Sequence, residues 1–303
     1  MGERKEMKKA VIAAAILLIS FHVINAQLAP SARWTVETFV DYGFIEPNIT
    51  YLTVDGMEMK LDVYRPKNLG ERKVPTLVFF HGGGWRRGTK ESYSLRVLPW
   101  MELGWNVVNV EYRMSPTAKA PAAIEDAVCA VRWVFDNANK FNFDRKTVVV
   151  SGQSAGGHLA LMAGMAENGR FDSKCPGELF KVAAIVNWYG IGDVWDLLEG
   201  KNRMEFAREW IGDARLSEKN FVDTLSPINY VRKDLPPIIS IHGDADTTVP
   251  YSHSTRLHAM LTEAGVRNLL HTVKGGDHGP FSKTEGVEAY SVIRTFLVEN
   301  GVR

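Results

Sequence analysis

The pentapeptide Gly152-Gln153-Ser154-Ala155-Gly156 directly follows the largely β-branched run of residues 147–151. A strand that ends in Gly-x-Ser-x-Gly and continues as a helix makes a sharp turn, which lifts the serine hydroxyl clear of the backbone. The two glycines are needed because a side chain at either position would crowd this turn. Such a hydroxyl is a candidate nucleophile, provided that a base accepts its proton during attack.

A second glycine-rich segment, His81-Gly82-Gly83-Gly84-Trp85, follows the apolar run of residues 76–80. Attack on a carbonyl group places negative charge on its oxygen, and backbone N–H groups that are fixed beforehand stabilise that charge. Glycines allow the backbone to approach this oxygen closely. We therefore expect the N–H groups of Gly83, Gly84 and Ala155 to form an oxyanion hole.

A carboxylate and an imidazole lie in two further loops. Asp246 follows the apolar run of residues 237–241, and His278 lies in a glycine-rich loop after residues 268–273. Loops at the carboxyl ends of parallel strands gather in one crevice. The order Ser, Asp, His is the order of the α/β-hydrolase fold. The sequence thus predicts that His278 takes the proton of Ser154 and that Asp246 holds the imidazole in the required tautomer.

Other residues compete for these two roles. Asp244 lies in the same loop as Asp246, and either carboxylate could instead cap the following helix. His278 is the predicted base because it sits in a glycine-rich loop after the last strand. The other histidines considered are expected to be structural or to lie at the surface: His81, His158, His242, His253, His258 and His271.

Longer stretches around these residues resemble the hormone-sensitive-lipase-like esterases, and in particular the bifunctional feruloyl and acetyl-xylan carbohydrate esterases. The similarity runs from about Asn48 to the C-terminus. The segments that carry it are His81–Trp85, Glu111–Pro116, Ala123–Ala127, Gly152–Ala160, His242–Pro250 and Gly275–Gly279. The resemblance implies an α/β-hydrolase that cleaves esters through an acyl-enzyme, without a metal or an organic cofactor. It further implies acetyl or feruloyl groups of plant cell-wall xylan as substrates.

The same resemblance bears on individual residues. The Asp-x-x-Val-Pro context of residues 246–250 favours Asp246 over Asp244 as the triad carboxylate. It also implies that some aromatic residues bind substrate, and the candidates are Trp85, Trp188 and Tyr189. Trp85 has an alternative role, which is to brace its own loop. The matching residues Glu111, Tyr112, Arg113 and Asp126 are expected to be structural.

Composition narrows the class of protein. The chain has 303 residues, a formal net charge of +1 and a hydrophobic content of 45%, which is ordinary for a globular protein. No basic patch or charge block supports binding to nucleic acid or to a membrane surface. The partner we expect is a small-molecule or polysaccharide ester.

Residues 1–26 have the pattern of an export signal. A positively charged start precedes an apolar run from Ala10 to Ile24, and Ala26 offers a small residue for cleavage. An uncleaved anchor is the alternative, although the run is short for a membrane span. The sequence predicts a secreted or periplasmic protein whose residues 27–303 form one catalytic domain.

These motifs require a framework of alternating strands and helices. Two alternating runs, 49–54 and 57–64, flank Asp55-Gly56 and predict a hairpin. Strands and helices then alternate, which indicates a mainly parallel α/β sheet of eight strands. The further strands are expected at residues 76–80, 105–110, 147–150, 182–186, 237–241 and 269–273, and the helices at residues 122–139, 155–167, 253–264 and 288–300. Residues 187–234 are less regular and are predicted to form a small cap.

The two cysteines, Cys129 and Cys175, have no metal-ligand spacing. An exported protein could join them, but Cys129 lies on the apolar face of a predicted helix, where free cysteines are common. The sequence therefore favours two unpaired thiols.

Three other functions remain open. An amide or formamide hydrolase can use the same fold, and so can a lipase, although no long apolar lid helix is evident. A non-catalytic binding module is the third possibility. The intact set of Ser154, Asp246 and His278 argues against it.

Overall fold

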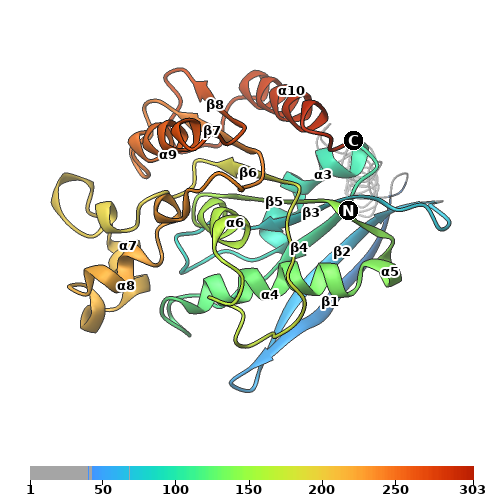
Figure 1. The fold of residues 1–303 in the computed structure, drawn as a ribbon, viewed down its shortest axis with the longest axis horizontal. Coiled ribbons are helices and arrows are strands. Elements are labelled where there is room, and N and C mark those ends of the chain that lie inside the picture. Colours follow the sequence, from blue (N-terminus) through green and yellow to red (C-terminus); the bar gives the residue numbers. More distant parts are fainter. Residues whose placement is uncertain (1–39, 41–42, 68) are drawn as a thin grey trace, which may run out of the picture. The chain divides into compact units, whose positions relative to one another are not determined.

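The computed structural model describes residue 40 and residues 43–67 and 69–303 (Figure 1). The predicted export signal, residues 1–26, lies outside this part. None of the helices in the described ranges combines the length and the apolar character that crossing a membrane requires.

Eight strands of the described residues form one sheet, in the order β1-β2-β4-β3-β5-β6-β7-β8. The hairpin of β1 and β2 turns at Asp55 and Gly56, which have φ values of 50° and 76°, as a tight two-residue hairpin turn requires. β2 is also antiparallel to β4, and the later neighbouring pairs are parallel. The predicted α/β-hydrolase fold is thus confirmed. The strands are β1 (Gly43–Val54), β2 (Met57–Pro66), β3 (Val74–Phe80), β4 (Asn106–Val110), β5 (Phe143–Gln153), β6 (Ala184–Trp188), β7 (Ile238–Gly243) and β8 (Asn268–Val273).

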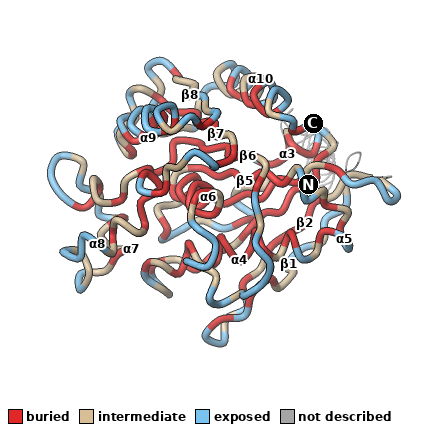
Figure 2. The backbone as a smooth tube through the Cα atoms, in the orientation of Figure 1, coloured by how far each residue is buried: buried red, intermediate tan, exposed pale blue. Residues whose placement is uncertain are grey.

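Helices connect these strands and cover the sheet. α4 packs on α6, and α3 meets α10 through the rings of Trp100 and Tyr290. Strands β4, β6 and β7 are buried along their whole length (Figure 2), as expected of strands covered on both faces. The helices are α3 (Ser94–Glu102), α4 (Ala122–Asp136), α5 (Ala138–Phe141), α6 (Ala155–Met165), α7 (Glu205–Ile211), α8 (Lys219–Asp223), α9 (Ser252–Glu263) and α10 (Lys283–Glu299).

The helices depart from the prediction at α4 and at α3. The helix expected over residues 122–139 is divided at Asn137 into α4 and α5. Helix α3 was not predicted. It contains Pro99, and proline in a helix interior removes a backbone hydrogen bond, so the sequence pattern of this segment is a weak helix signal.

The expectation of two free thiols is wrong. Cys129 of α4 and Cys175 form a disulfide, with their Cα atoms 5.6 Å apart. The segment after α6 returns across α4, where Arg132 Nη2 donates to Asp172 Oδ2 at 2.5 Å. This ion pair and a hydrogen bond from Arg132 to the Glu178 carbonyl hold the segment that carries Cys175. The pairing depends on this long-range packing, which the apolar pattern of α4 does not contain.

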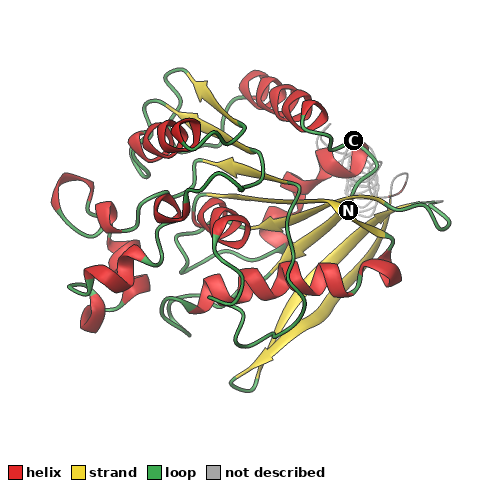
Figure 3. Ribbon diagram, in the orientation of Figure 1, coloured by secondary structure: helices red, strands yellow, loops and turns green. Residues whose placement is uncertain are grey.

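The predicted cap, residues 187–234, consists of the end of β6, the short helices α7 and α8, and single 3-10 turns joined by loops (Figure 3). Its aromatic residues mainly pack against the rest of the domain. Trp210 of α7 is fully buried, and its ring stacks on that of Trp85 with the centroids 4.1 Å apart. The cap is therefore anchored to the loop that follows β3.

Candidate active site

Ser154 occupies the turn between the end of β5 and the start of α6. Its backbone has φ 56° and ψ −119°, a conformation that side-chain-bearing residues rarely adopt and that marks functional turns. A Cβ atom on Gly152 would lie 2.3 Å from the Gly156 carbonyl oxygen, and one on Gly156 would lie 2.0 Å from that of Phe80. Both glycines are therefore required, as the sequence indicated, because backbone atoms occupy the space.

The structure brings Ser154, His278 and Asp246 together in one hydrogen-bonded chain. His278 Nε2 lies 2.8 Å from Ser154 Oγ, and His278 Nδ1 lies 2.7 Å from Asp246 Oδ2. Because the carboxylate accepts, the proton of the neutral imidazole resides on Nδ1, and Nε2 is free to accept from the serine hydroxyl. The arrangement can thus remove the hydroxyl proton as the oxygen attacks.

Asp246 is held by four N–H groups. The backbone N–H groups of Thr248 and Val249 both donate to Oδ1 at 2.8 Å. His278 and His242 share Oδ2, with His242 Nε2 at 3.1 Å. Burial alone would raise the pKa of Asp246, but these hydrogen bonds hold it well below its usual range. The residue therefore carries a fixed negative charge beside the imidazole.

The sequence analysis expects a structural role for His242 but does not predict its contact with Asp246. It is fully buried, and its Nδ1 lies 2.7 Å from Ser254 Oγ. Its Nε2 also lies 3.0 Å from the Val249 carbonyl oxygen, so this nitrogen is the donor toward Asp246. His242 thus helps to fix the carboxylate oxygen that also accepts from His278. Its place four residues before Asp246 was a usable signal, because both flank one tight loop.

The competing residues have other partners. Asp244 accepts from the backbone N–H of Gly275 at 2.6 Å and from Lys274 Nζ at 3.1 Å, so it orders the neighbouring loop. His158 donates from Nε2 to the Leu225 carbonyl at 2.7 Å, and burial lowers its pKa to about 4. It is neutral and lies under the turn that holds Ser154.

The loop after β3 forms one wall of the pocket. Gly83 and Gly84 line the pocket together with Ser154 and have φ values of 122° and 64°. A Cβ atom on Gly83 would lie 1.9 Å from the carbonyl oxygen of Arg87, so only glycine fits there. Ala155 is the first residue of α6, and the first N–H groups of a helix have no acceptor within it. These three residues are at positions suited to binding an oxyanion.

The pocket above Ser154 and His278 has a volume of about 500 Å³. Tyr93, Tyr189 and Phe206 give it aromatic walls, and Phe206 comes from α7 of the cap. Tyr189 was predicted as a substrate-binding residue and does line the pocket, with its ring centroid 4.8 Å from that of His278. Tyr93 was not predicted, because it directly precedes the unpredicted helix α3.

Two of the predicted substrate-binding residues do not line this pocket. Trp85 is fully buried between Trp210 and His158, so it braces its loop, which was the alternative role. Trp188 is 4% exposed, and its carbonyl oxygen accepts from the Ser154 N–H at 2.9 Å. Both residues therefore support the turn and loop from within the core, where the aromatic ring has no access to substrate.

Residues 111–126 support the site from a distance. Arg113 forms a buried ion pair with Asp126 at 2.8 Å, and the Tyr112 hydroxyl donates to the His81 carbonyl at 2.9 Å. The side chain of Glu111 accepts from the Lys90 N–H at 2.9 Å. These contacts tie the loop after β4 to the loop after β3, which agrees with the structural role expected of these residues.

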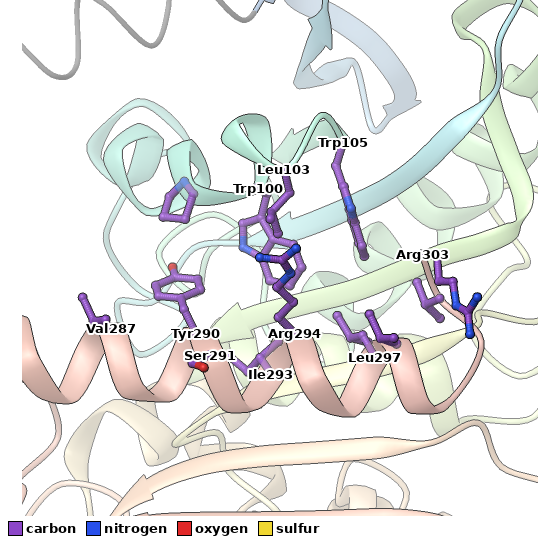
Figure 4. A pocket seen from close by; sticks show the side chains of 13 residues that line it. Trp100, Leu103, Trp105, Val287, Tyr290, Ser291, Ile293, Arg294, Leu297 and Arg303 are labelled. Atoms are coloured by element: carbon purple, nitrogen blue, oxygen red, sulfur yellow. The ribbon is translucent and has the colours of Figure 1, made fainter.

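A second cavity, of about 560 Å³, lies between α3 and α10 (Figure 4). Trp100, Trp105 and Tyr290 give it a largely apolar lining, and burial raises the pKa of Tyr290 to about 12. Among the described residues that line it there is no histidine and no carboxylate side chain, so these residues offer no base to activate a nucleophile. The pocket at Ser154 is the candidate active site.

Comparison with known proteins agrees with this geometry. Residues 61–261 match the BD-FAE family. Esterase LipQ of Mycobacterium tuberculosis is 30% identical over 249 residues, which cover 78% of this chain and 58% of LipQ. The chain spans about half the length of the curated relatives it matches.

The similar solved structures are also esterases. The thermophilic esterase Est2 of Thermogutta terrifontis superimposes with a TM-score of 0.72 at 28% identity, over 85% of this chain and 92% of Est2. A truncated carbohydrate esterase from gut microbiota superimposes with a TM-score of 0.70 at 27% identity, over 84% of this chain and 97% of that chain. The match over residues 61–261, more than half of the sequence, shows that the chain belongs to the BD-FAE family of α/β-hydrolases.

Proposed function

We propose that this protein is a serine carboxylester hydrolase with Ser154 as nucleophile, His278 as base and Asp246 as the orienting carboxylate. The observation that carries the proposal is the hydrogen-bonded chain through Ser154 Oγ, His278 and Asp246, with distances of 2.8 and 2.7 Å. The match to a family with esterase relatives supports it.

In the first half of the reaction, Ser154 Oγ attacks the ester carbonyl while His278 Nε2 takes its proton. The backbone N–H groups of Gly83, Gly84 and Ala155 stabilise the charge on the carbonyl oxygen. The intermediate collapses, His278 returns the proton to the leaving alcohol, and the acyl group remains on Ser154.

In the second half, water replaces the alcohol. His278 takes a proton from the water as the water oxygen attacks the acyl carbonyl, and it then protonates Ser154 Oγ as the carboxylic acid leaves. Asp246 accepts from Nδ1 throughout, which keeps Nε2 toward the reacting atoms and stabilises the imidazolium. One ester and one water give one acid and one alcohol.

The proposed substrates are short acyl or hydroxycinnamoyl esters, with acetyl or feruloyl groups of plant cell-wall xylan as the specific case. A pocket of about 500 Å³ with Tyr93, Tyr189 and Phe206 in its walls suits a planar acyl group or a sugar ring. The structural similarity to a carbohydrate esterase supports a saccharide ester. We further propose export to the periplasm or the medium, on the basis of the signal pattern in residues 1–26.

The test measures acid release from acetylated xylan, methyl ferulate and p-nitrophenyl acetate. Ser154→Ala is expected to lower kcat by about 10,000-fold or more, as with other triads. Ser217→Ala, an exposed serine outside the pocket, is the matched control. Near wild-type hydrolysis by folded Ser154→Ala would refute the mechanism. Cleavage of p-nitrophenyl acetate alone would keep the mechanism and reject the plant-wall substrate.

A panel of formamides, peptides and long-chain esters separates the alternatives. Preferred cleavage of an amide would indicate an amide hydrolase. A steep rise in rate above the solubility limit of a long-chain ester would indicate a lipase. Binding of all these compounds without turnover would indicate a binding module.

A further inference from the structure

The lining of the catalytic pocket is strongly basic. Arg86, Arg87 and Arg96 all line the cavity that contains Ser154 and His278. The described residues that line it include no aspartate and no glutamate. The chain as a whole has a formal net charge of only +1, so this positive charge is a local property of the pocket.

Two of these arginines are fixed to the loop that carries the candidate oxyanion hole. The backbone N–H groups of Arg86 and Arg87 donate to the carbonyl oxygen of Gly83 at 3.3 and 3.2 Å. Both side chains therefore start one turn away from the glycines that face Ser154. This short turn fixes the backbones of both arginines relative to these glycines.

Arg96 approaches from a different element, the first turn of α3. Its carbonyl oxygen accepts from the Tyr290 hydroxyl at 3.1 Å, which fixes the backbone there. Burial raises the pKa of Tyr189, and the positive charge of Arg96 opposes that rise. Its guanidinium thus contributes to the field at Tyr189, whose ring packs against His278.

These arginines have few ionic partners of their own. Arg86 Nη1 lies 3.3 Å from Glu209 Oε2. Within the described part of the chain, neither Arg87 nor Arg96 has a carboxylate within ion-pair distance. All three arginines are exposed at the mouth of the pocket, where water also solvates them. Like charges gathered around one pocket repel one another, and an anionic ligand relieves this repulsion.

We propose that this pocket selects esters that carry a carboxylate close to the scissile bond, which Arg87 and Arg96 bind. The guanidinium fork matches a carboxylate through two parallel N–H···O bonds. The proposal rests on the esterase function proposed above and names its substrate class. The carboxylate belongs either to the alcohol, as in an acetylated uronic acid, or to the acyl group, as in a half-ester of a dicarboxylic acid. It takes no part in the bond changes.

The test compares kcat/KM within two matched pairs of esters. In the first pair, acetylated methyl glucuronoside and acetylated methyl glucoside, the carboxylate is on the alcohol. In the second pair, p-nitrophenyl hemisuccinate and p-nitrophenyl butyrate, it is on the acyl group. We expect a preference of about tenfold for the anionic member of one pair, and the pair that shows it identifies the location of the carboxylate.

Two further measurements examine the cause of this preference. Raising the ionic strength from about 0.02 M to about 0.5 M should reduce it several-fold, because salt screens charges at the rim of a pocket. Arg87→Gln and Arg96→Gln should each lower the preference about fivefold, and Arg87→Lys should restore part of it. Arg267→Gln changes an exposed arginine outside the pocket and should leave both rates unchanged.

The outcomes separate this inference from the function on which it rests. Equal hydrolysis of both members of each pair, unaffected by salt, would overturn carboxylate selection while leaving the esterase function intact. Faster cleavage of the neutral esters would overturn it as well. Failure to hydrolyse any of the four esters would contradict the esterase function itself. Because the salt series uses the unaltered protein, a variant that fails to fold does not weaken the test.

Discussion

Replacing Asp246 by asparagine tests the orienting role of the carboxylate. Asp246 accepts four N–H groups, two on Oδ1 from the backbone and two on Oδ2 from His278 and His242. Asparagine keeps the size and shape of the side chain but has one oxygen and one NH₂ group. Either orientation of the amide therefore sets its NH₂ group against two of the four N–H donors.

The expected loss of activity follows from these two orientations of the amide. With the NH₂ group toward the backbone, the N–H groups of Thr248 and Val249 lose their acceptor, at a cost of about 1–3 kcal/mol each. With the NH₂ group toward His278, Nδ1 must become the acceptor, and the imidazole proton moves to Nε2. The imidazole then cannot take the proton of Ser154. We expect the second orientation to dominate and kcat to fall by about 10,000-fold, the effect of the equivalent change in other triads.

The assay measures kcat/KM for p-nitrophenyl acetate, with the melting temperature as a check on folding. Asp244→Asn is the matched control, because Asp244 lies in the same loop and bonds to Gly275 and Lys274. It should retain most of the activity. The reasoning fails if folded Asp246→Asn stays within tenfold of the wild type, or if Asp244→Asn loses activity to the same extent.

Three other predictions concern stability. Gly156→Ala should prevent folding or lower the melting temperature steeply, because the added Cβ atom would lie 2.0 Å from a backbone oxygen. Replacing Cys129 and Cys175 by serine should lower the free energy of unfolding by up to about 4 kcal/mol, the chain-entropy value for a cross-link across 46 residues, measured by denaturant titration. Burial lowers the pKa of His158 and of His258 from 6.5 to about 4. Each histidine therefore contributes stability that is fully present above about pH 6.5 and is lost as the pH falls toward 4. The loss in free energy of unfolding is about 3 kcal/mol for each histidine. Melting temperatures should therefore fall over this pH range.

Each of these predictions has a clear contrary result. Gly286 in α10 has open space around it, so Gly286→Ala is the control for Gly156→Ala, and equal melting temperatures for the two variants would contradict the packing argument. A serine double variant as stable as the wild type would show that the cross-link does not restrain the unfolded chain. A constant melting temperature between about pH 7 and pH 4.5 would contradict the neutral, buried state of the histidines.

Local patterns sufficed to predict the sheet and the elements that end at the site. The hairpin around Asp55-Gly56 shows as two alternating runs, and the strands before Ser154 and before Asp246 show as apolar runs that end in turn residues. Such signals are local, because strand and turn preferences depend on neighbouring residues. The loops at the strand ends then bring His278 within hydrogen-bonding distance of both Ser154 and Asp246.

The features that were missed depend on contacts between distant segments. Cys129 pairs with Cys175 because the chain returns across α4. Trp85 faces away from the pocket because Trp210, far along the sequence, stacks on it. Arg96 reaches the pocket from α3, a helix whose proline obscures its pattern. The direction of a side chain at a loop or helix end is set by such packing, and periodicity does not encode it.

The central claim is that Ser154 carries the acyl group between the two halves of the reaction. The most direct test mixes the protein with p-nitrophenyl acetate, quenches with acid within one turnover, and determines peptide masses after proteolysis. The account predicts one acetyl group on the peptide that contains Ser154, and none on the corresponding peptide of Ser154→Ala. Acetylation of a different residue during turnover, or undiminished turnover by Ser154→Ala, would contradict it.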